Sequence, residues 1–118
     1  MPKSLYLSNV LLNHTLRNVA FTPPVQVFVA LYTVAPTILG GGTEVSGGGY
    51  GRQLGTFSAA ASQLTSNTVD ILFPVATADW GTVVAFGLFD ASSGGNMLYF
   101  NNLSASRLVL TNDPSSSL

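Results

Sequence analysis

Short apolar segments with a two-residue repeat are the feature that most restricts the fold of this 118-residue chain. The clearest one spans residues 25–32, where apolar side chains occupy both alternating faces: Val25, Val27, Val29 and Leu31 point one way, and Phe28, Ala30 and Tyr32 the other. Successive side chains of a strand point to opposite faces of a sheet. This pattern therefore predicts a central strand that is covered on both sides.

Further apolar segments, separated by turn residues, predict additional short strands at residues 50–57, 67–73, 82–89, 97–101 and 108–110. Between two of them, residues 90–96 are rich in Asp, Gly and Asn, which suit the backbone angles of a hairpin loop. We expect Asp90 to cap this loop. Because the strands do not alternate with helices, a doubly wound nucleotide-binding fold is excluded. The fold class expected is mainly β, an antiparallel β-sandwich or a jelly-roll-like barrel, with one N-terminal α-helix.

The helix is expected at about residues 4–19, where Ser4 can cap the start and Pro23-Pro24 enforces an extended exit. At 100° per residue its apolar side chains fall on two faces. We expect the first face to pack on the chain's own core: Leu5, Leu12, Leu16 and Val19. We expect the second to contact a neighbouring subunit: Tyr6, Val10, Leu11 and His14. A helix covered wholly within its own chain is the alternative.

The chain divides into one β-rich domain at residues 1–113 and a short Ser-rich tail at 114–118. Within the domain, residues 35–49 form a long glycine-rich segment. Such a segment suits either a loop shaped by a partner or a plain flexible loop. Glu44 lies in it and Tyr50 and Arg52 follow it, and we place these three side chains in an interface because Tyr and Arg are enriched there.

Charged residues make up only 8% of the chain, against about 25% in an ordinary soluble domain. With 47% hydrophobic residues, this predicts an obligate member of an assembly, whose surface is covered by other subunits. The four basic residues are scattered, so no patch could neutralise several phosphates, and nucleic acid is not an expected partner. No apolar run is long enough for a membrane helix, and the N-terminus does not read as a signal peptide.

The sequence offers little reactive chemistry. His14 is the one histidine and there is no cysteine, so no metal site, cofactor or histidine-based triad is expected. The glycine runs lack the context of a phosphate loop. Four carboxylates could in principle supply a glycosidase pair: Glu44, Asp70, Asp79 and Asp90. Backbone hydrogen bonding at turns explains the acids better, so we expect no enzyme. Trp80 is expected in the core, with a partner contact as the alternative.

An ordered set of segments carries a family resemblance. The segments are Ala30-Leu31-Tyr32-Thr33 with Pro36; Gly42-Thr43-Glu44-Val45-Ser46-Gly47-Gly48-Gly49-Tyr50-Gly51-Arg52; Phe73-Pro74 with Ala76-Thr77-Ala78-Asp79-Trp80-Gly81-Thr82-Val83; and Phe86-Gly87-Leu88-Phe89-Asp90-Ala91 with Gly94-Gly95-Asn96. Together they resemble a family of small tailed-bacteriophage virion proteins, commonly labelled tail fibre proteins, with related β proteins serving as capsid decoration subunits. The chain departs from that family at Gly51, where members often have Ala, and at Asn112-Asp113-Pro114, where members often continue into another strand. We therefore expect the closing strand to be either missing or donated by a neighbour.

The resemblance implies structural work in a virion. We favour a cement protein on the capsid surface, which would bind the major capsid protein and copies of itself as a homotrimer. The alternative is a tail fibre or adhesin subunit that binds a host receptor or glycan through loops such as residues 35–49. A third class, a hydrolase of cell-wall sugar, would require Glu44 and one aspartate to face each other in a cleft.

Overall fold

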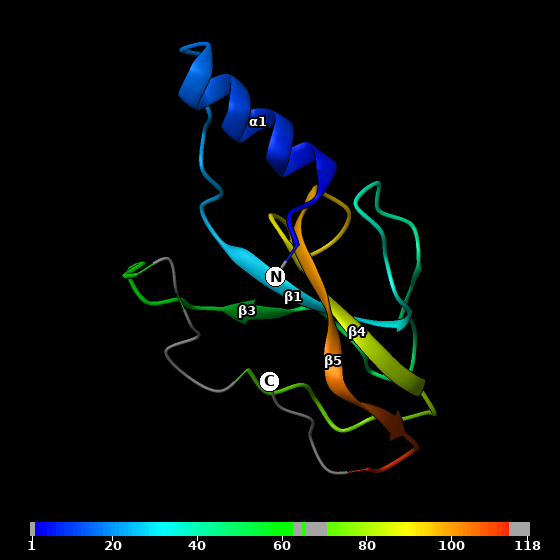
Figure 1. Ribbon diagram of the computed structural model, residues 1–118. Helices are drawn as coiled ribbons and strands as arrows, with labels where there is room; N and C mark the ends of the chain where they lie inside the picture. Colours follow the sequence, from blue (N-terminus) through cyan, green and yellow to red (C-terminus); the bar gives the residue numbers. More distant parts are fainter. Residues whose placement is uncertain (1, 63–64, 66–70, 114–118) are drawn as a thin grey trace.

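The computed structural model describes residues 2–62, 65 and 71–113. It contains one helix, α1 (Leu5–Leu16), and five strands: β1 (Val27–Val34), β2 (Thr43–Glu44), β3 (Gln53–Gly55), β4 (Gly81–Phe89) and β5 (Met97–Val109). All five strands join one antiparallel sheet (Figure 1). The expectation of a mainly β chain with one N-terminal helix is confirmed.

Strand β1 lies at the centre of the sheet. One of its edges pairs with β4, from Phe28 opposite Phe89 to Tyr32 opposite Ala85. The other edge is shared, because β3 pairs with its first residues and β2 with its last. The four residues from Val29 to Tyr32 are all buried, which confirms the sequence prediction of a central strand covered on both faces. The predicted start at Val25 is wrong, because the strand begins at Val27 and Val25 is 99% exposed.

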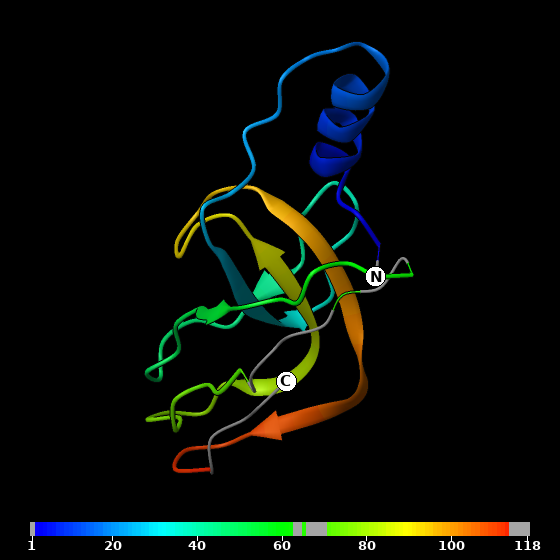
Figure 2. The same ribbon diagram turned by 90° about the vertical axis from the view of Figure 1, so that its left-hand side faces the viewer.

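Strands β4 and β5 form the predicted hairpin. Asp90 caps its loop, because the Asp90 carboxylate accepts hydrogen bonds from the Asn96 backbone nitrogen at 2.7 Å and the Asn96 side-chain amide at 3.1 Å. The prediction of separate strands at 97–101 and 108–110 is wrong, because β5 is continuous across both. Its ladder passes through a bulge in which residue 84 of β4 opposes residues 103–106 of β5. The extra residues accompany a strong bend in β5 (Figure 2).

Within the part of the chain that the structure describes, the strands predicted at residues 50–57 and 67–73 are not found as predicted. The one at 50–57 shortens to β3, three residues long. The one at 67–73 falls partly outside the described residues: of residues 67–73 the structure describes 71–73, which belong to no named strand, although Ile71 and Phe73 are buried. The glycine-rich segment 35–49 is not one loop, because β2 lies within it and pairs with β1.

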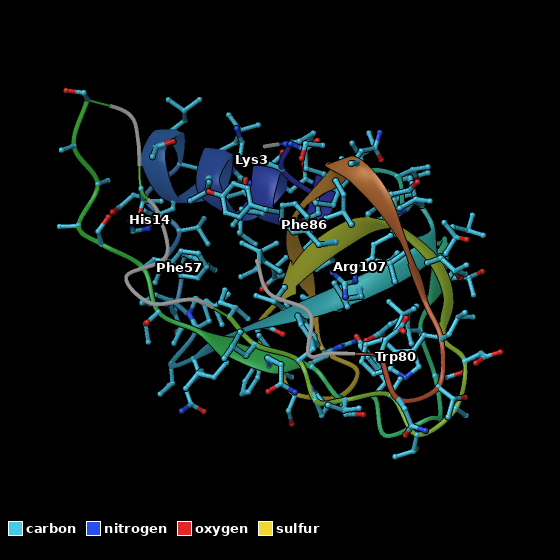
Figure 3. All side chains as sticks on the ribbon, turned by 90° about the horizontal axis from the view of Figure 1, so that it is seen from below. Lys3, His14, Phe57, Trp80, Phe86 and Arg107 are labelled. Carbon is cyan, nitrogen blue, oxygen red and sulfur yellow. The ribbon has the colours of Figure 1, made fainter. Side chains whose placement is uncertain are left out.

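The main core lies on one face of the bent sheet. The sheet contributes Val29, Leu31, Val83, Leu88 and Val109, and the covering segments contribute Val45, Ile71, Phe73, Ala76 and Trp80. Phe57 and Phe86, labelled with Trp80 in Figure 3, are partly buried and pack against this core. Among the described residues, irregular segments and not a second sheet cover this face. Trp80 is buried and donates a hydrogen bond to the Gly48 carbonyl at 2.9 Å, so its predicted place in the core is confirmed.

Helix α1 is attached to the sheet at its start. Ser4 is the N-cap: its hydroxyl accepts from the Leu7 backbone nitrogen at 3.1 Å and donates to the Met97 carbonyl, and its own backbone nitrogen donates to the Leu98 carbonyl at 2.9 Å. The helix ends at Leu16, three residues before the predicted end, and Asn18 adopts a φ of 55°. Leu7 is the buried side chain of this helix.

The prediction that one helix face packs on the chain's own core through Leu5, Leu12, Leu16 and Val19 is wrong. These four side chains are 41%, 55%, 77% and 45% exposed. The helix extends beyond the end of the sheet (Figures 1 and 2), so the sheet offers no surface to cover that stripe. The buried side chain of the helix is instead Leu7, which lies on the opposite side.

Candidate functional site

A groove lies where the start of α1 meets the sheet. Its volume is about 380 Å³. Its walls are Ser4, Leu5 and Tyr6 of the helix start, the turn at residues 38–41, and the end of the hairpin loop at residues 95–97. Tyr32 of β1 and Phe89 of β4 also line it, and both are almost fully buried. The groove therefore has an aromatic base and a rim that includes the exposed Ile38 and Leu39.

The two aromatic rings belong to a stacked cluster. Tyr32 and Phe89 stack with their centroids 6.5 Å apart and their planes at 14°. The guanidinium carbon of Arg52 lies 3.8 Å from the Phe89 ring centroid, which is a cation–π contact. Burial raises the pKa of the Tyr32 hydroxyl, and the negative charge of Glu44 raises it further. This hydroxyl therefore stays protonated at neutral pH.

Next to this cluster, Glu44, Tyr50 and Arg52 form one hydrogen-bonded network. The Arg52 guanidinium binds the Glu44 carboxylate in a two-point pair, with Nε to Oε2 and Nη2 to Oε1 both at 2.9 Å. The Tyr50 hydroxyl donates to the same Oε2 at 2.7 Å. Arg52 Nη1 also donates to the carbonyls of Ala91 at 3.0 Å and Gly94 at 2.8 Å. The network thus ties β2 to the β4–β5 hairpin loop.

The electrostatics of the network favour the ionised pair. Burial acts to raise the pKa of Glu44, but hydrogen bonds from Arg52 and Tyr50 outweigh it and hold that pKa below its usual value. Burial and the hydrogen bond to Glu44 raise the pKa of Tyr50, so its hydroxyl remains a donor. The hydrogen bond to Glu44 raises the pKa of Arg52 against the opposing effect of burial.

Sequence reasoning selected Glu44, Tyr50 and Arg52 as separate interface residues, but it missed that they bind one another. The Arg52 side chain is 8% exposed, and its hydrogen-bonding groups are directed at partners within the chain. The register that brings Glu44 opposite Tyr32 is a property of the β1–β2 pairing, for which the sequence carries no local signal. A role for these residues against a partner subunit stays a prediction.

The other predicted interface residues lie on α1, and the structure separates them. Tyr6 is 38% exposed and lines the groove. Val10 and Leu11 are half-buried, on the side of the helix that carries Leu7. His14 is exposed, and its ring nitrogen Nδ1 lies 3.1 Å from the Val19 carbonyl oxygen. Their contact with a neighbouring subunit also stays a prediction.

The family model described as podophage GP4 fiber I protein gp80 matches residues 2–117. The chain belongs to this family. The match includes the helix, the sheet and the groove, and it confirms the resemblance to small tailed-phage virion proteins. By its description the family is a fibre protein, and hence a structural component of the virion. No curated protein matches the chain.

In this member of the gp80 family, three of the four carboxylates considered for catalysis have hydrogen-bond partners of their own, in different places. Glu44 is held by Arg52 and Tyr50, Asp90 by Asn96, and Asp79 by the backbone nitrogen and hydroxyl of Thr111 at 2.8 and 2.9 Å. These hydrogen bonds lower the pKa of Asp79. Asp70, the fourth candidate, lies outside the described residues. Loop hydrogen bonding, as expected from the sequence, accounts for Asp90. The same expectation is wrong for Asp79, because its partner Thr111 lies 32 residues further along the chain.

The described part of this fibre-family chain contains neither a metal-binding cluster nor a membrane-crossing helix. Residues 2–62, 65 and 71–113 contain no group of three or more His, Cys, Asp or Glu side chains placed to hold a metal ion. Figure 3 shows His14 on α1, at the far side of the molecule from Trp80. Over the same residues, no helix has the length and apolar character needed to cross a membrane.

Proposed function

We propose that this chain is a structural subunit of a podophage tail fibre. The observation that carries the proposal is the match of residues 2–117 to a family described as a podophage fibre protein. This description favours the fibre alternative over the cement reading that the sequence resemblance placed first. The corresponding location is the tail of the virion, and the partners are other fibre chains and copies of this one. The homotrimer stays a prediction.

The surface of the chain supports a role in assembly. Large apolar side chains are exposed on the helix, on the turn that follows β1 and on the loops: Leu12, Leu16, Ile38, Leu39, Leu72 and Val75 are each between 45% and 77% exposed. Only 8% of the residues are charged. Exposed apolar area of this extent on a weakly charged surface is typical of a chain that associates with others. We therefore propose contact with other subunits, and not catalysis, as its work.

Binding of a host receptor or glycan ranks behind assembly in this proposal. A sugar site usually presents exposed aromatic rings on which the sugar stacks. In the groove Tyr6 is partly exposed, but Tyr32 and Phe89 are only 5% and 8% exposed and are already engaged in stacking. The groove thus offers one accessible ring from the helix and a largely covered aromatic base, which is a weak platform for a sugar.

The test is a phage that lacks the gene for this chain, compared with the same phage complemented in trans. The fibre proposal expects lost fibre density in cryo-electron micrographs and reduced adsorption to host cells, with capsids as robust as the complemented control. If the mutant capsids open at lower temperature or after milder osmotic shock while adsorption is unchanged, the proposal is wrong and the cement reading is correct.

A further inference from the structure

The exposed face of α1 has the spacing of a coiled-coil seam. Leu5, Asn9, Leu12 and Leu16 follow one another at intervals of four, three and four residues. At 100° per residue they fall within a stripe about 60° wide. In heptad terms Leu5 and Leu12 take d positions, and Asn9 and Leu16 take a positions. Val19, three residues beyond Leu16, continues the spacing just after the helix ends.

Among the described residues, the body of the protein leaves most of this stripe uncovered. Leu5, Leu12 and Leu16 are 41%, 55% and 77% exposed, and Asn9 is exposed as well. Leu7, which is buried, and Val10 and Leu11, which are half-buried, lie on the opposite side of the helix. One face of α1 therefore packs on its own chain. Among the described residues, the face with heptad spacing is largely uncovered at Leu12 and Leu16, and partly covered at Leu5, which lines the groove.

The composition of the stripe favours a second copy of the same helix as its cover. Residues 5–16 contain no Lys, Arg, Asp or Glu, so two copies of α1 do not repel each other, and the helix has no cation that would attract an anionic lipid surface. An Asn side chain has both a donor and an acceptor. Two Asn9 side chains that meet in a parallel pair can therefore satisfy each other, and a single a-position Asn is a known determinant of register.

We propose that α1 pairs in parallel and in register with α1 of a second copy of this chain, through Leu5, Asn9, Leu12 and Leu16. The pairing does not rest on the fibre assignment, because it uses the helix alone and would hold for a chain on a capsid too. The helix is about 18 Å long, less than two full heptads. Its start is already fixed by the Ser4 cap and by Leu7, so little ordering is needed, but a seam this short implies weak, concentration-dependent association.

The first test compares Leu12→Glu with His14→Glu in the full chain by sedimentation equilibrium over a range of concentrations. Both changes put a Glu on an exposed position of the same helix, on opposite sides. The proposal places the contact between copies on the Leu12 face of α1, and not on the His14 face that the sequence pattern assigned to a neighbouring subunit. We therefore expect the wild type and His14→Glu to self-associate, and Leu12→Glu to raise the dissociation constant at least about tenfold. A wild type that stays monomeric at the highest concentration, or two variants that associate equally, would overturn the proposal.

The second test uses the absence of cysteine from the chain. Under mild oxidation, Asn9→Cys should form a disulfide-linked dimer, because a parallel, in-register seam places the two copies of residue 9 together. His14→Cys, on the far side of the helix, should remain largely unlinked. Circular dichroism confirms that each variant is folded. Equal linking of both variants, or none in Asn9→Cys, would contradict the parallel pairing.

Discussion

The Tyr50 hydroxyl accepts a hydrogen bond from the backbone nitrogen of Leu31 at 3.0 Å. Leu31 lies on β1 between the residues that pair with β3 and those that pair with β2, so within the described part of the chain no strand partner reaches its N–H on this edge. The Tyr50 side chain therefore supplies the hydrogen-bond acceptor that a neighbouring strand would otherwise provide. The Tyr50 ring also stacks on Phe73 and meets Trp80 edge-on. These two ring contacts fix the position of the Tyr50 hydroxyl.

Removal of this hydroxyl should therefore destabilise the sheet. We expect Tyr50→Phe to lower the free energy of unfolding by about 1–3 kcal/mol, because it leaves the Leu31 N–H without its acceptor and Glu44 without one donor. Urea titration followed by Trp80 fluorescence measures the change. Tyr6→Phe, at a partly exposed tyrosine of α1, is the matched control and should stay within about 0.5 kcal/mol. Equal effects of the two changes would refute the assigned role.

The ion pair of Glu44 and Arg52 should make the stability depend on pH in acid. The pKa of Glu44 is lowered in the folded chain from its ordinary 4.5, so the unfolded chain binds more protons in this range. The resulting stability is fully present above about pH 4.5 and is lost as the pH falls through the lowered folded value. We expect Glu44→Gln to lose less stability than the wild type as the pH falls from about 5 into the acid range, because the variant has no carboxylate to protonate at this position. Parallel curves for the two proteins would contradict this.

Two neighbouring glycines offer a matched pair. Both Gly47 and Gly48 have a positive φ, 72° and 59°, but a Cβ at Gly48 would lie 2.8 Å from the Ala78 carbonyl oxygen and 2.9 Å from Trp80 Nε1, whereas one at Gly47 meets nothing within 4 Å. Gly47→Ala should cost about 1–2 kcal/mol from backbone strain. Gly48→Ala should cost at least about 1 kcal/mol more, from overpacking. Thermal unfolding measures both, and equal losses would show that the loop relaxes freely.

Helix docking can be tested with two leucines of α1. Leu7 is 5% exposed and Leu16 is 77% exposed. Leu7→Ala should lower the free energy of unfolding by about 2–5 kcal/mol, because it leaves a cavity where the buried Leu7 side chain holds the helix against the rest of the chain. Leu16→Ala should change it by less than about 0.5 kcal/mol in dilute solution, where copies are separated. Chemical denaturation at low protein concentration measures both. A larger loss of stability for Leu16→Ala than for Leu7→Ala would show that the face containing Leu16 packs on the core, as the sequence pattern predicted.

The predictions that succeeded rest on local signals. Ser4 caps α1 and Asp90 caps the hairpin because such side chains bond backbone groups only a few residues away. The double alternation around Val29 and Ala30 identified the buried central strand, since only a strand inside the sheet loses both faces to packing. Trp80 was placed in the core because of the size of its ring.

The errors concern relationships over longer distances. The sequence pattern showed that α1 has two apolar faces, but which face meets the sheet depends on how the chain enters the helix at Ser4 and on how far the sheet extends. Likewise β5 runs unbroken through a bulge that period-two alternation does not reveal. Glu44, Tyr50 and Arg52 were chosen by residue type, while their mutual hydrogen bonds depend on strand register.

By itself, the sequence determined a mainly β chain with one capped helix, few charges and a virion family resemblance, because periodicity, turn residues and composition act over short spans. Tertiary structure alone decided that β3 and β2 share one edge of β1, that Tyr50 fills the gap between them, and that the Leu5–Leu16 stripe faces outward. The physical reason is that strand register and helix docking are set by packing between segments distant in the chain, where many local patterns are compatible with more than one arrangement.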